Sequence, residues 1–537
     1  MVIEPTVELE DEIAARIGEL LQRRGLGELA VHPQREAVDA MLFQGSGENK
    51  SAQFSADTDV SRAEEERAPI SSLRVAYGPE SVEEQLTAEG SHVRFAIVTP
   101  EKFCSRAFVQ CMADLHARGE LAPVVIDEGH LIAQWGLSFR DAYVQLRSAL
   151  AQVRAGVVLA PPPATSMPRV PLIPPLRVHC VSGSMNERQA RQAAKLLGLC
   201  LCETDFRFYS MDRPEISFAV VDLTAEEGDW RTVLAAGARR MAEGCLTATR
   251  SIIFVATSSD AEAVVRTIGK LGWGLTAVPF YRRLDAQGAG GRAAALKRWR
   301  ESERGVLVST ILGAHGLNNL DVDFTGHLCL RGDPRTMIQE LGRSCRARQP
   351  GREWFMRHPR LLEAAARFVD FRDGGALASL RNMAGFCCAE GGCRREHLLR
   401  VLGCSFAVKV GREQCCCVCD LGLSTAASET ALVDLTDGAV ALLTELRERA
   451  RAGESTPFVR TLQAGAWRKE CASPGDANSL FLHLFANGAL DLDTVESGTV
   501  HFLRVLPGRE KAAAIESGEV AVLVRCRYPV IPLPVSP

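Results

Sequence analysis

The chain has 537 residues, of which 46% are hydrophobic and 24% are charged, and its formal net charge is −4 at pH 7. This composition is ordinary for a folded globular protein of about three or four domains, and the small net charge gives no overall attraction to nucleic acid. No run of about 18 apolar residues is present, so a membrane span is not expected. The acidic N-terminal stretch does not resemble a signal peptide. The 18 cysteines therefore favour a reducing compartment, where thiols bind metals or pack in the core.

The first part of the chain alternates apolar runs with helical patterns, which is typical of a parallel α/β domain. Residues 8–43 are expected to form two helices around a turn, whereas residues 44–91 are polar and carry little periodicity. The Pro-rich tract at residues 155–176 can form neither a regular helix nor a central strand. The remaining patterns predict strands at residues 94–100, 122–128 and 177–181 and helices at residues 105–118, 139–154 and 186–197.

The second part of the chain alternates more regularly. Strands are predicted at residues 216–223, 251–256, 274–279, 305–310 and 326–330, and helices at residues 230–243, 261–271 and 293–301. This alternation predicts a second parallel sheet that helices cover on both faces. A Cys-rich insert follows at residues 387–420. Beyond it, an apolar helix at residues 479–487 precedes alternating strands at residues 488–493 and 498–505, and the Pro-rich tail is expected to be disordered.

Two carboxylates, Asp127 and Glu128, directly follow an apolar run. The run predicts a buried strand, and the carboxyl end of such a strand is where open α/β nucleotide enzymes hold Mg²⁺ and activate a water. Gly129 and His130 complete a DExH box. A lone DExH box often arises by chance, so the segments after it carry weight. These are Gln134-Trp135-Gly136 and Phe139-Arg140.

A second group of polar side chains, Gln339, Arg343 and Arg346, lies in the stretch QELGRSCR. On a helix these side chains would share one face, because positions three and four apart are neighbours. Guanidinium groups inserted from a second domain can neutralise charge on a transferring phosphoryl group. Taken alone, such a stretch is more often a solvated basic helix. Its place after a strand, in a chain with a DExH box, favours the catalytic interpretation with Arg346 as the arginine finger.

The order of these motifs resembles the RecQ family of superfamily 2 DNA helicases, over roughly residues 28–422. The resemblance implies an α/β fold with two RecA-like parallel-sheet motor domains that clamp ATP and Mg²⁺. In this family pattern Gln34 would recognise adenine, Asp127 would hold Mg²⁺, Glu128 would activate water and His130 would complete motif II. The further family segments fall at residues 182–184 (motif III), 212–216 (the junction before the second motor domain), 309–310 with 316–318 (motif V) and 339–346 (motif VI).

The same resemblance implies that DNA is the partner. Thr99, in a Thr-Pro-Glu segment, would touch the DNA backbone. Gln134, Trp135, Phe139 and Arg140 belong to the segment that couples ATP hydrolysis to DNA in RecQ-type helicases, and Trp135 and Phe139 would sense the DNA. A DEAH-type RNA helicase is disfavoured, because the QWG, RPEI and CRR segments of this chain point to the RecQ family.

The phosphate-binding loop departs from the family pattern. A working loop has the form G-x-x-x-x-G-K-[ST], because glycine lets backbone N–H groups converge on the phosphates. Lys50 and Ser51 stand where the last two residues of that pattern would, but Asn49 replaces the last glycine and Glu48 adds negative charge. No apolar strand precedes the loop, and residues 52–75 lack the helix and strand that would carry motif Ia. The first motor domain is therefore expected to be abbreviated; the alternative is a flexible polar loop that binds no phosphate.

The Cys-rich insert resembles the RecQ zinc module. Two thiolates on a C-x2-C knuckle and a third from a preceding helix supply most of a tetrahedral Zn²⁺ site. Cys416 and Cys419 would form the knuckle, and Cys393 would be the distant ligand. The family's fourth ligand position holds a glycine here, and the first candidate to replace it is Cys415. Other candidates are Cys417, Cys404 and His397. Buried or free thiols without a metal are the competing interpretation.

These patterns predict four regions: a first RecA-like domain at residues 1–210, a second at 211–365, a helical zinc-binding module at 366–422 and a C-terminal region at 423–537. The C-terminal helix and two strands form either a winged helix, which RecQ-type proteins often carry, or an unrelated small α/β domain. The leading hypothesis is an ATP-dependent 3′-to-5′ DNA helicase that acts on single-stranded DNA and duplex junctions. The alternative is a helicase-derived DNA-binding protein without turnover. We expect either protein to be soluble and intracellular, nuclear in a eukaryote and cytoplasmic otherwise.

Overall fold

A computed structural model of the chain describes residues 2–3, 74–76, 86, 93–121, 123–135, 141–155, 175–287, 291–310, 322–330, 334–343, 345, 350–366, 369, 371, 374–388, 393–404, 416, 432–497 and 500–525, and the description below is confined to them. The chain divides into two compact units, Met1–Phe208 and Tyr209–Pro537. This division lies close to residue 210, where the first predicted domain ends, and the finer division into four regions stays a prediction. Within the described residues, no helix has the combination of length and apolarity that a membrane crossing requires.

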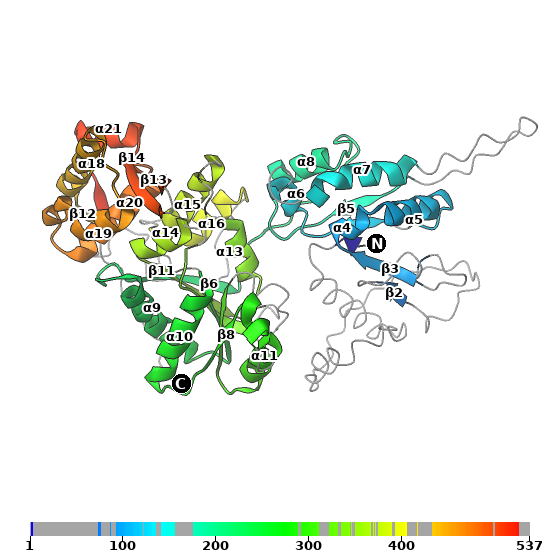
Figure 1. Cartoon of the computed structure of the whole chain (residues 1–537), viewed down its shortest axis with the longest axis horizontal. Coiled ribbons are helices and arrows are strands. Elements are labelled where there is room, and N and C mark those ends of the chain that lie inside the picture. The colour runs from blue at the N-terminus through cyan, green and yellow to red at the C-terminus, as the bar shows by residue number, and fades with distance from the viewer. Residues whose placement is uncertain are drawn as a thin grey trace, which may run out of the picture. The chain divides into compact units, whose positions relative to one another are not determined.

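The first unit is built on a five-stranded parallel sheet with the strand order β2-β3-β1-β4-β5 (Figure 1). Its strands are β1 (Val2–Ile3), β2 (Arg74–Ala76), β3 (Val93–Val98), β4 (Val124–Ile126) and β5 (Val178–Cys180). The side chains of Val124 and Ile126 are fully buried, as expected for a strand inside a parallel sheet. Because β4 and β5 are parallel neighbours, the turns that follow them lie at the same edge of the sheet.

The described helices of this unit pack on the sheet through their apolar faces. They are α4 (Pro100–Phe103), α5 (Arg106–Ala117), α6 (His130–Trp135), α7 (Asp141–Ala155) and α8 (Glu187–Leu196). Polar caps set where helices begin: the Ser105 hydroxyl accepts the Phe108 N–H, and Asn186 forms a reciprocal capping box with Gln189. Phe108 of α5 and Leu146 of α7 join the core around β4.

The first unit differs from the sequence prediction in three places. The strand expected at residues 94–100 ends at Val98, because Thr99 caps α4 and Pro100 occupies its first position. Strand β2 forms at the end of a stretch that was expected to hold no strand. Strand β1 inserts between β3 and β4, and a two-residue strand is too short for hydrophobic periodicity to reveal. The two helices predicted in residues 8–43 lie outside the described residues.

The second unit contains a six-stranded parallel sheet with the order β6-β11-β10-β7-β9-β8. Its strands are β6 (Ile216–Asp222), β7 (Arg250–Val255), β8 (Thr276–Phe280), β9 (Gly305–Thr310), β10 (Val322–His327) and β11 (Gly351–Arg357). The parallel sheet predicted from the alternation is confirmed. The strand expected at residues 326–330 was placed wrongly, since β10 starts at Val322. The polar residues in its sequence, VDFTGH, interrupt the apolar run by which a buried strand is recognised. Strand β11 was not predicted, since Arg352 and Glu353 interrupt its apolar pattern.

Helices connect these strands and continue into the region beyond the sheet. They are α9 (Trp230–Cys245), α10 (Ser258–Leu271), η3 (Arg282–Gln287), α11 (Gly291–Glu301), α13 (Pro334–Leu341), α14 (Pro359–Ala366), α15 (Gly374–Cys387) and α16 (Arg394–Val401). The helices predicted at residues 230–243, 261–271 and 293–301 correspond to α9, α10 and α11. Thr257 caps α10 in a capping box with Asp260, and Gly272, with φ +68°, ends it.

The C-terminal part of this unit is a helical cluster with two short antiparallel sheets (Figure 1). Its elements are β12 (Leu432–Asp434), α18 (Thr436–Arg451), α19 (Phe458–Ala464), η4 (Ala466–Glu470), α20 (Pro474–Ala486), β13 (Leu490–Ser497), β14 (Val500–Pro507), α21 (Glu510–Glu516) and β15 (Leu523–Arg525). The predicted apolar helix and two-stranded ribbon are present as α20, β13 and β14. Their assignment to a winged helix stays a prediction. Asn478 of α20 donates to the Thr224 carbonyl at 2.8 Å, which links this cluster to the turn after β6.

Candidate functional site

The acidic pair lies in the turn at the carboxyl end of β4, as the sequence predicts. The Asp127 Oδ1 accepts the backbone N–H of Glu128 at 2.8 Å. Glu128 adopts a left-handed backbone conformation with φ +49°, which a residue with a side chain rarely adopts outside functional turns. Its side chain is 30% exposed. A Cβ added to Gly129 would collide with the Cys180 sulfur, so this turn packs directly on the end of β5.

His130 ties the turn after β4 to the turn after β5. Its Nδ1 lies 3.1 Å from the Glu128 Oε2 and 2.9 Å from the Ser182 Oγ, and its ring is buried. The Gly129 N–H donates to the Val181 carbonyl at 2.8 Å. The structure therefore brings together the predicted motif II residues and the predicted motif III segment, which are about 50 residues apart in the sequence.

A neutral thiol lies beside the acidic pair. Burial raises the pKa of Cys180 to about 12, and the neighbouring Asp127 carboxylate contributes in the same direction. A thiol with so high a pKa is a poor nucleophile and a poor metal ligand. Asp127 and Glu128 instead present carboxylate oxygens, which are the ligands that Mg²⁺ prefers in proteins. The residues present thus fit a magnesium ion, with oxygen donors at the edge of the sheet where nucleotides bind in open α/β folds.

The other predicted residues of the first unit are only partly described. Thr99 is the N-cap of α4, and its hydroxyl accepts the Lys102 N–H at 3.3 Å. Gln134 and Trp135 lie in the last turn of α6, the helix that His130 begins. The remaining candidates, Gln34, Lys50, Ser51, Phe139 and Arg140, lie outside the described residues.

In the second unit, the predicted motif VI begins on α13 and continues beyond the end of this helix. Gln339 and Glu340 belong to α13, which ends at Leu341. Arg343 lies in the following turn, where its N–H donates to the Glu340 carbonyl at 2.9 Å. The prediction that Gln339, Arg343 and Arg346 share one helical face is therefore wrong. Gly342 and the left-handed Cys345, with φ +52°, turn the chain away from the helix axis; Arg346 itself lies outside the described residues.

A buried group of charges that the sequence analysis missed anchors α13 to the sheet. His327, at the end of β10, lies 3.2 Å through Nδ1 from the Glu340 Oε2 and 2.9 Å through Nε2 from the Glu353 Oε2. The ring stacks on Phe355, with 4.3 Å between ring centroids. Burial by itself lowers the pKa of His327, but hydrogen bonds to Glu340 and Glu353 outweigh it and raise that pKa above 6.5. The only signal in the sequence was a lone histidine at the end of a strand.

Two of the four predicted zinc ligands, Cys393 and Cys416, lie among the described residues. Cys393 caps α16 and is buried, and Cys416 is buried and forms an isolated bridge with Phe218 of β6. Cys415 and Cys419 lie outside the described residues. His397, a candidate replacement, uses Nε2 to contact the Asn382 carbonyl at 3.0 Å, and burial lowers its pKa. Among the residues that can be placed, no three His, Cys, Asp or Glu side chains gather as a metal site.

Comparison with known proteins finds a helicase domain match within the second unit. Residues 240–348 match the model of the helicase conserved C-terminal domain. The chain is similar to ATP-dependent DNA helicase Q-like 2 of Arabidopsis thaliana, with 23% identity over 66% of this chain and 46% of the relative. It is also similar to ATP-dependent DNA helicase hus2/rqh1 of Schizosaccharomyces pombe, with 23% identity over 82% of this chain and 32% of the relative. The chain thus spans less than half the length of these relatives.

Among solved structures, the Mycobacterium smegmatis helicase Lhr bound to ssDNA and AMP-PNP aligns with 96% of this chain and 54% of its own, at 12% identity and a TM-score of 0.38. The family match and the RecQ-type relatives confirm the resemblance that the motifs suggested. Such relatives imply the use of ATP and Mg²⁺. The chain is therefore similar to RecQ-like helicases of superfamily 2.

Proposed function

We propose that this protein is an ATP-dependent DNA helicase of RecQ type, which couples ATP hydrolysis to 3′-to-5′ movement on DNA. The observation that carries the proposal is the turn after β4. There Glu128, in a strained left-handed conformation, is held by His130, and His130 in turn contacts Ser182 of the neighbouring turn. A carboxylate that is oriented through a buried histidine suits a base that must accept a proton from water in a fixed direction.

Each residue of the acidic turn has a separate proposed task. Asp127 would hold Mg²⁺, which, when bound, offsets charge on the β- and γ-phosphate oxygens. Glu128 would orient the attacking water and accept its proton. His130 would keep the Glu128 carboxylate in place and transmit its position to Ser182, since one ring nitrogen lies within hydrogen-bond distance of both groups. Gln34, Lys50 and Ser51 would bind the adenine and the phosphates.

The second unit would supply the positive charge for the transition state. Arg343 and Arg346 are the proposed donors, with Arg346 as the arginine finger, and Gln339 on α13 is the third proposed residue of this motif. Guanidinium groups suit this task, because they stay protonated and present several N–H donors to phosphate oxygens. The His327 group supports it indirectly by fixing Glu340, the residue next to Gln339, to β10 and β11.

DNA would be the partner along which ATP hydrolysis drives the protein. We propose that Thr99, Gln134, Trp135, Phe139 and Arg140 contact DNA or sense it, and that the Cys-rich module binds one structural Zn²⁺. The buried Cys393 and Cys416 fit this role as thiolate donors, with Cys419 and Cys415 as the remaining ligands. The proposed substrates are single-stranded DNA and duplex junctions, and the proposed location is the nucleus if the source is eukaryotic and the cytoplasm otherwise.

A second candidate function is a helicase-derived DNA-binding protein that has lost turnover. Glu48 and Asn49 in the phosphate loop favour it, because a carboxylate repels phosphate and the loop lacks its last glycine. The acidic turn and the helicase domain match favour retained hydrolysis. We therefore expect weak ATP hydrolysis in the unmodified chain.

A DNA-stimulated ATPase assay separates the two functions. The wild-type chain is compared with Glu128→Gln, which removes the proposed base, and with Glu120→Gln, a matched control on an exposed pair with Arg118. The helicase proposal expects turnover that Glu128→Gln abolishes and Glu120→Gln preserves. DNA binding without any hydrolysis above the Glu128→Gln background would support the binding protein instead.

A further inference from the structure

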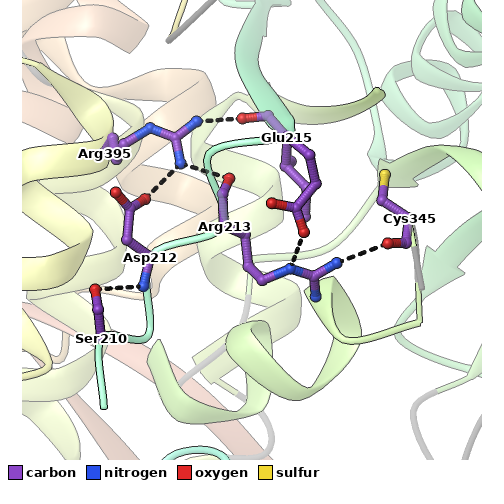
Figure 2. Close-up of polar contacts among 7 residues, drawn as sticks. Ser210, Asp212, Arg213, Glu215, Cys345 and Arg395 are labelled. Atoms are coloured by element: carbon purple, nitrogen blue, oxygen red, sulfur yellow. Dashed lines mark hydrogen bonds and ion pairs between the residues drawn. The ribbon is translucent and has the colours of Figure 1, made fainter. Parts of the chain in front are cut away.

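The segment that enters the second unit is clamped by one buried arginine from α16. The Arg395 Nη1 donates to the Asp212 Oδ1 at 2.7 Å and to the Arg213 carbonyl at 2.8 Å, and its Nη2 donates to the Ile216 carbonyl (Figure 2). The guanidinium also lies over the Phe218 ring, 4.8 Å from its centroid. Three acceptors within five residues of chain thus converge on a single side chain that is 1% exposed.

Helix α16 is itself fixed to the body of the unit next to this clamp. Arg394, the neighbour of Arg395, is fully buried and donates to the carbonyls of Phe386 and Cys387, which end α15. Removing two arginines from water costs several kcal/mol, and their hydrogen bonds to carbonyl and carboxylate oxygens offset part of that cost. The geometry of α16 therefore determines where residues 212–216 can lie.

Residues 212–216 also contact the turn after α13, which contains Arg343 and Cys345, through the Arg213 side chain. The Arg213 guanidinium pairs with Glu215 and donates through Nη2 to the Cys345 carbonyl at 3.0 Å (Figure 2). Cys345 holds a left-handed conformation, its N–H donates to the Val322 carbonyl at 2.8 Å, and its sulfur packs where a Cβ of Gly351 would be. This contact fixes the backbone of Cys345, which directly precedes the proposed arginine finger Arg346 in the sequence.

Residues 215–217 also hold Gly351, which lies on the other side of Arg346 in the sequence. The Gly351 N–H donates to the Glu215 carbonyl at 3.0 Å, and the Ser217 hydroxyl donates to the Gly351 carbonyl at 3.3 Å. Residues 345 and 351 bound the loop that includes Arg346. Both ends of that loop therefore rest on residues 213–217, and Arg395 holds this segment from the opposite side.

We propose that Arg395 and Arg213 are positioning residues, through which α16 of the Cys-rich module sets the geometry of the arginine turn after α13. Neither residue contacts the nucleotide in this proposal; they act through the backbone of residues 212–217 and Cys345. The effect on turnover rests on the function proposed above, whereas the mechanical link between α16 and Cys345 does not. The two parts are tested by separate measurements.

The link is tested by the reactivity of the Cys345 thiol, which is buried in the intact turn. The full-length wild type, Arg213→Gln and Arg395→Lys are treated with a thiol reagent, and labelling of the peptide that contains Cys345 is followed by mass spectrometry. Arg395→Lys keeps the charge but cannot reach three acceptors in a fork geometry. Arg400→Gln is the control, because Arg400 lies on the same helix and pairs only at the surface with Glu396.

We expect Cys345 labelling to accelerate about tenfold in Arg213→Gln and in Arg395→Lys, because each variant loses a charge-assisted hydrogen bond that closes the turn. Arg400→Gln should label like the wild type. Arg213 is 30% exposed, so its variant should fold even if a variant of the buried Arg395 does not. Labelling at the wild-type rate in the folded Arg213→Gln chain would overturn the proposal, whether or not the protein hydrolyses ATP.

The effect on turnover is tested by ATP hydrolysis of the same variants in the presence of single-stranded DNA. An arginine that acts in the transition state changes kcat, so a displaced arginine should lower kcat about 10- to 100-fold with KM for ATP within about twofold of wild type. A general loss of structure would instead reduce the active fraction and broaden thermal unfolding. Faster labelling of the two variants with unchanged kcat would contradict the positioning role. Faster labelling of the variants together with a wild type that hydrolyses no ATP would refute the proposed function and leave the link standing.

Discussion

Replacing His327 by leucine should destabilise the second unit more than the loss of one side chain suggests. The substitution leaves Glu340 and Glu353 facing each other in a dry environment, since their side chains are 4% and 0% exposed. Two carboxylates that lose their shared cationic partner stay desolvated without its attraction. The aromatic rings of Phe254 and Phe355 that flank His327 offer no replacement hydrogen bond.

The expected loss is about 3–5 kcal/mol in the free energy of unfolding, the range found when one member of a buried ion pair is removed. The triple variant His327→Leu, Glu340→Met, Glu353→Met should recover most of it, because replacing all members of a buried charge group by apolar residues is often nearly neutral. The single variant should therefore be less stable than the triple variant. This reversal separates an unpaired-charge effect from a simple packing defect.

The stabilisation that His327 contributes should fall as pH rises. The pKa of His327 is raised in the folded protein, so the stabilisation from its protonation is fully present below about pH 6.5 and is lost as pH rises through the folded value. Relative to the triple variant, which lacks all three groups, the wild type should lose stability as pH rises above 6.5. Burial opposes protonation here, and the two glutamates outweigh it.

Urea unfolding followed by tryptophan fluorescence gives the measurement. Five of the six tryptophans lie in the second unit, so their signal reports on it. They are Trp230, Trp273, Trp299, Trp354 and Trp467. A loss below about 1 kcal/mol in His327→Leu, or a triple variant less stable than the single one, would refute the reasoning that these charges stabilise each other.

Three further predictions concern the first unit and the Cys-rich module. Gly129→Ala should push Cys180 aside and reduce ATP hydrolysis at least tenfold, whereas Gly269→Ala, where a Cβ meets nothing within 4 Å, should retain wild-type turnover; equal rates in both variants would contradict the packing argument. Asn49→Gly should raise ATP hydrolysis by restoring the phosphate-loop pattern, and an unchanged rate would show that the residue does not limit turnover. Metal analysis should find one zinc per chain in the wild type and less in Cys393→Ser, with lower thermal stability in that variant; a metal-free wild type would rule out the zinc module.

Much of the architecture was accessible from the sequence because its signals are local. Runs such as Gly305–Thr310 and Val124–Ile126, which the acidic pair follows, form buried strands, whose apolar stretches are easy to detect. Caps such as Asn186 also depend on near neighbours in the chain. These local patterns sufficed to place the DExH residues at the carboxyl end of a strand.

The features that the sequence could not reveal depend on tertiary contacts. Strand β11 is hidden by Arg352 and Glu353, and the role of Glu353 emerges only when His327 lies opposite it on β10. The end of α13 at Leu341 depends on the left-handed Cys345, whose N–H bonds to Val322 of another strand. Arg395 contacts Asp212 across 183 residues of sequence, a distance over which no spacing pattern operates.

The central claim is that the acidic turn and the motif VI arginines hydrolyse ATP when DNA is bound. The most direct measurement is steady-state ATP hydrolysis with single-stranded DNA for the wild type, Glu128→Gln, Arg346→Lys and Asn49→Gly. The account predicts weak turnover in the wild type, a higher rate in Asn49→Gly, and loss of turnover in Glu128→Gln and Arg346→Lys with DNA binding retained. Wild-type and Asn49→Gly chains that bind DNA but hydrolyse ATP no faster than Glu128→Gln would contradict it.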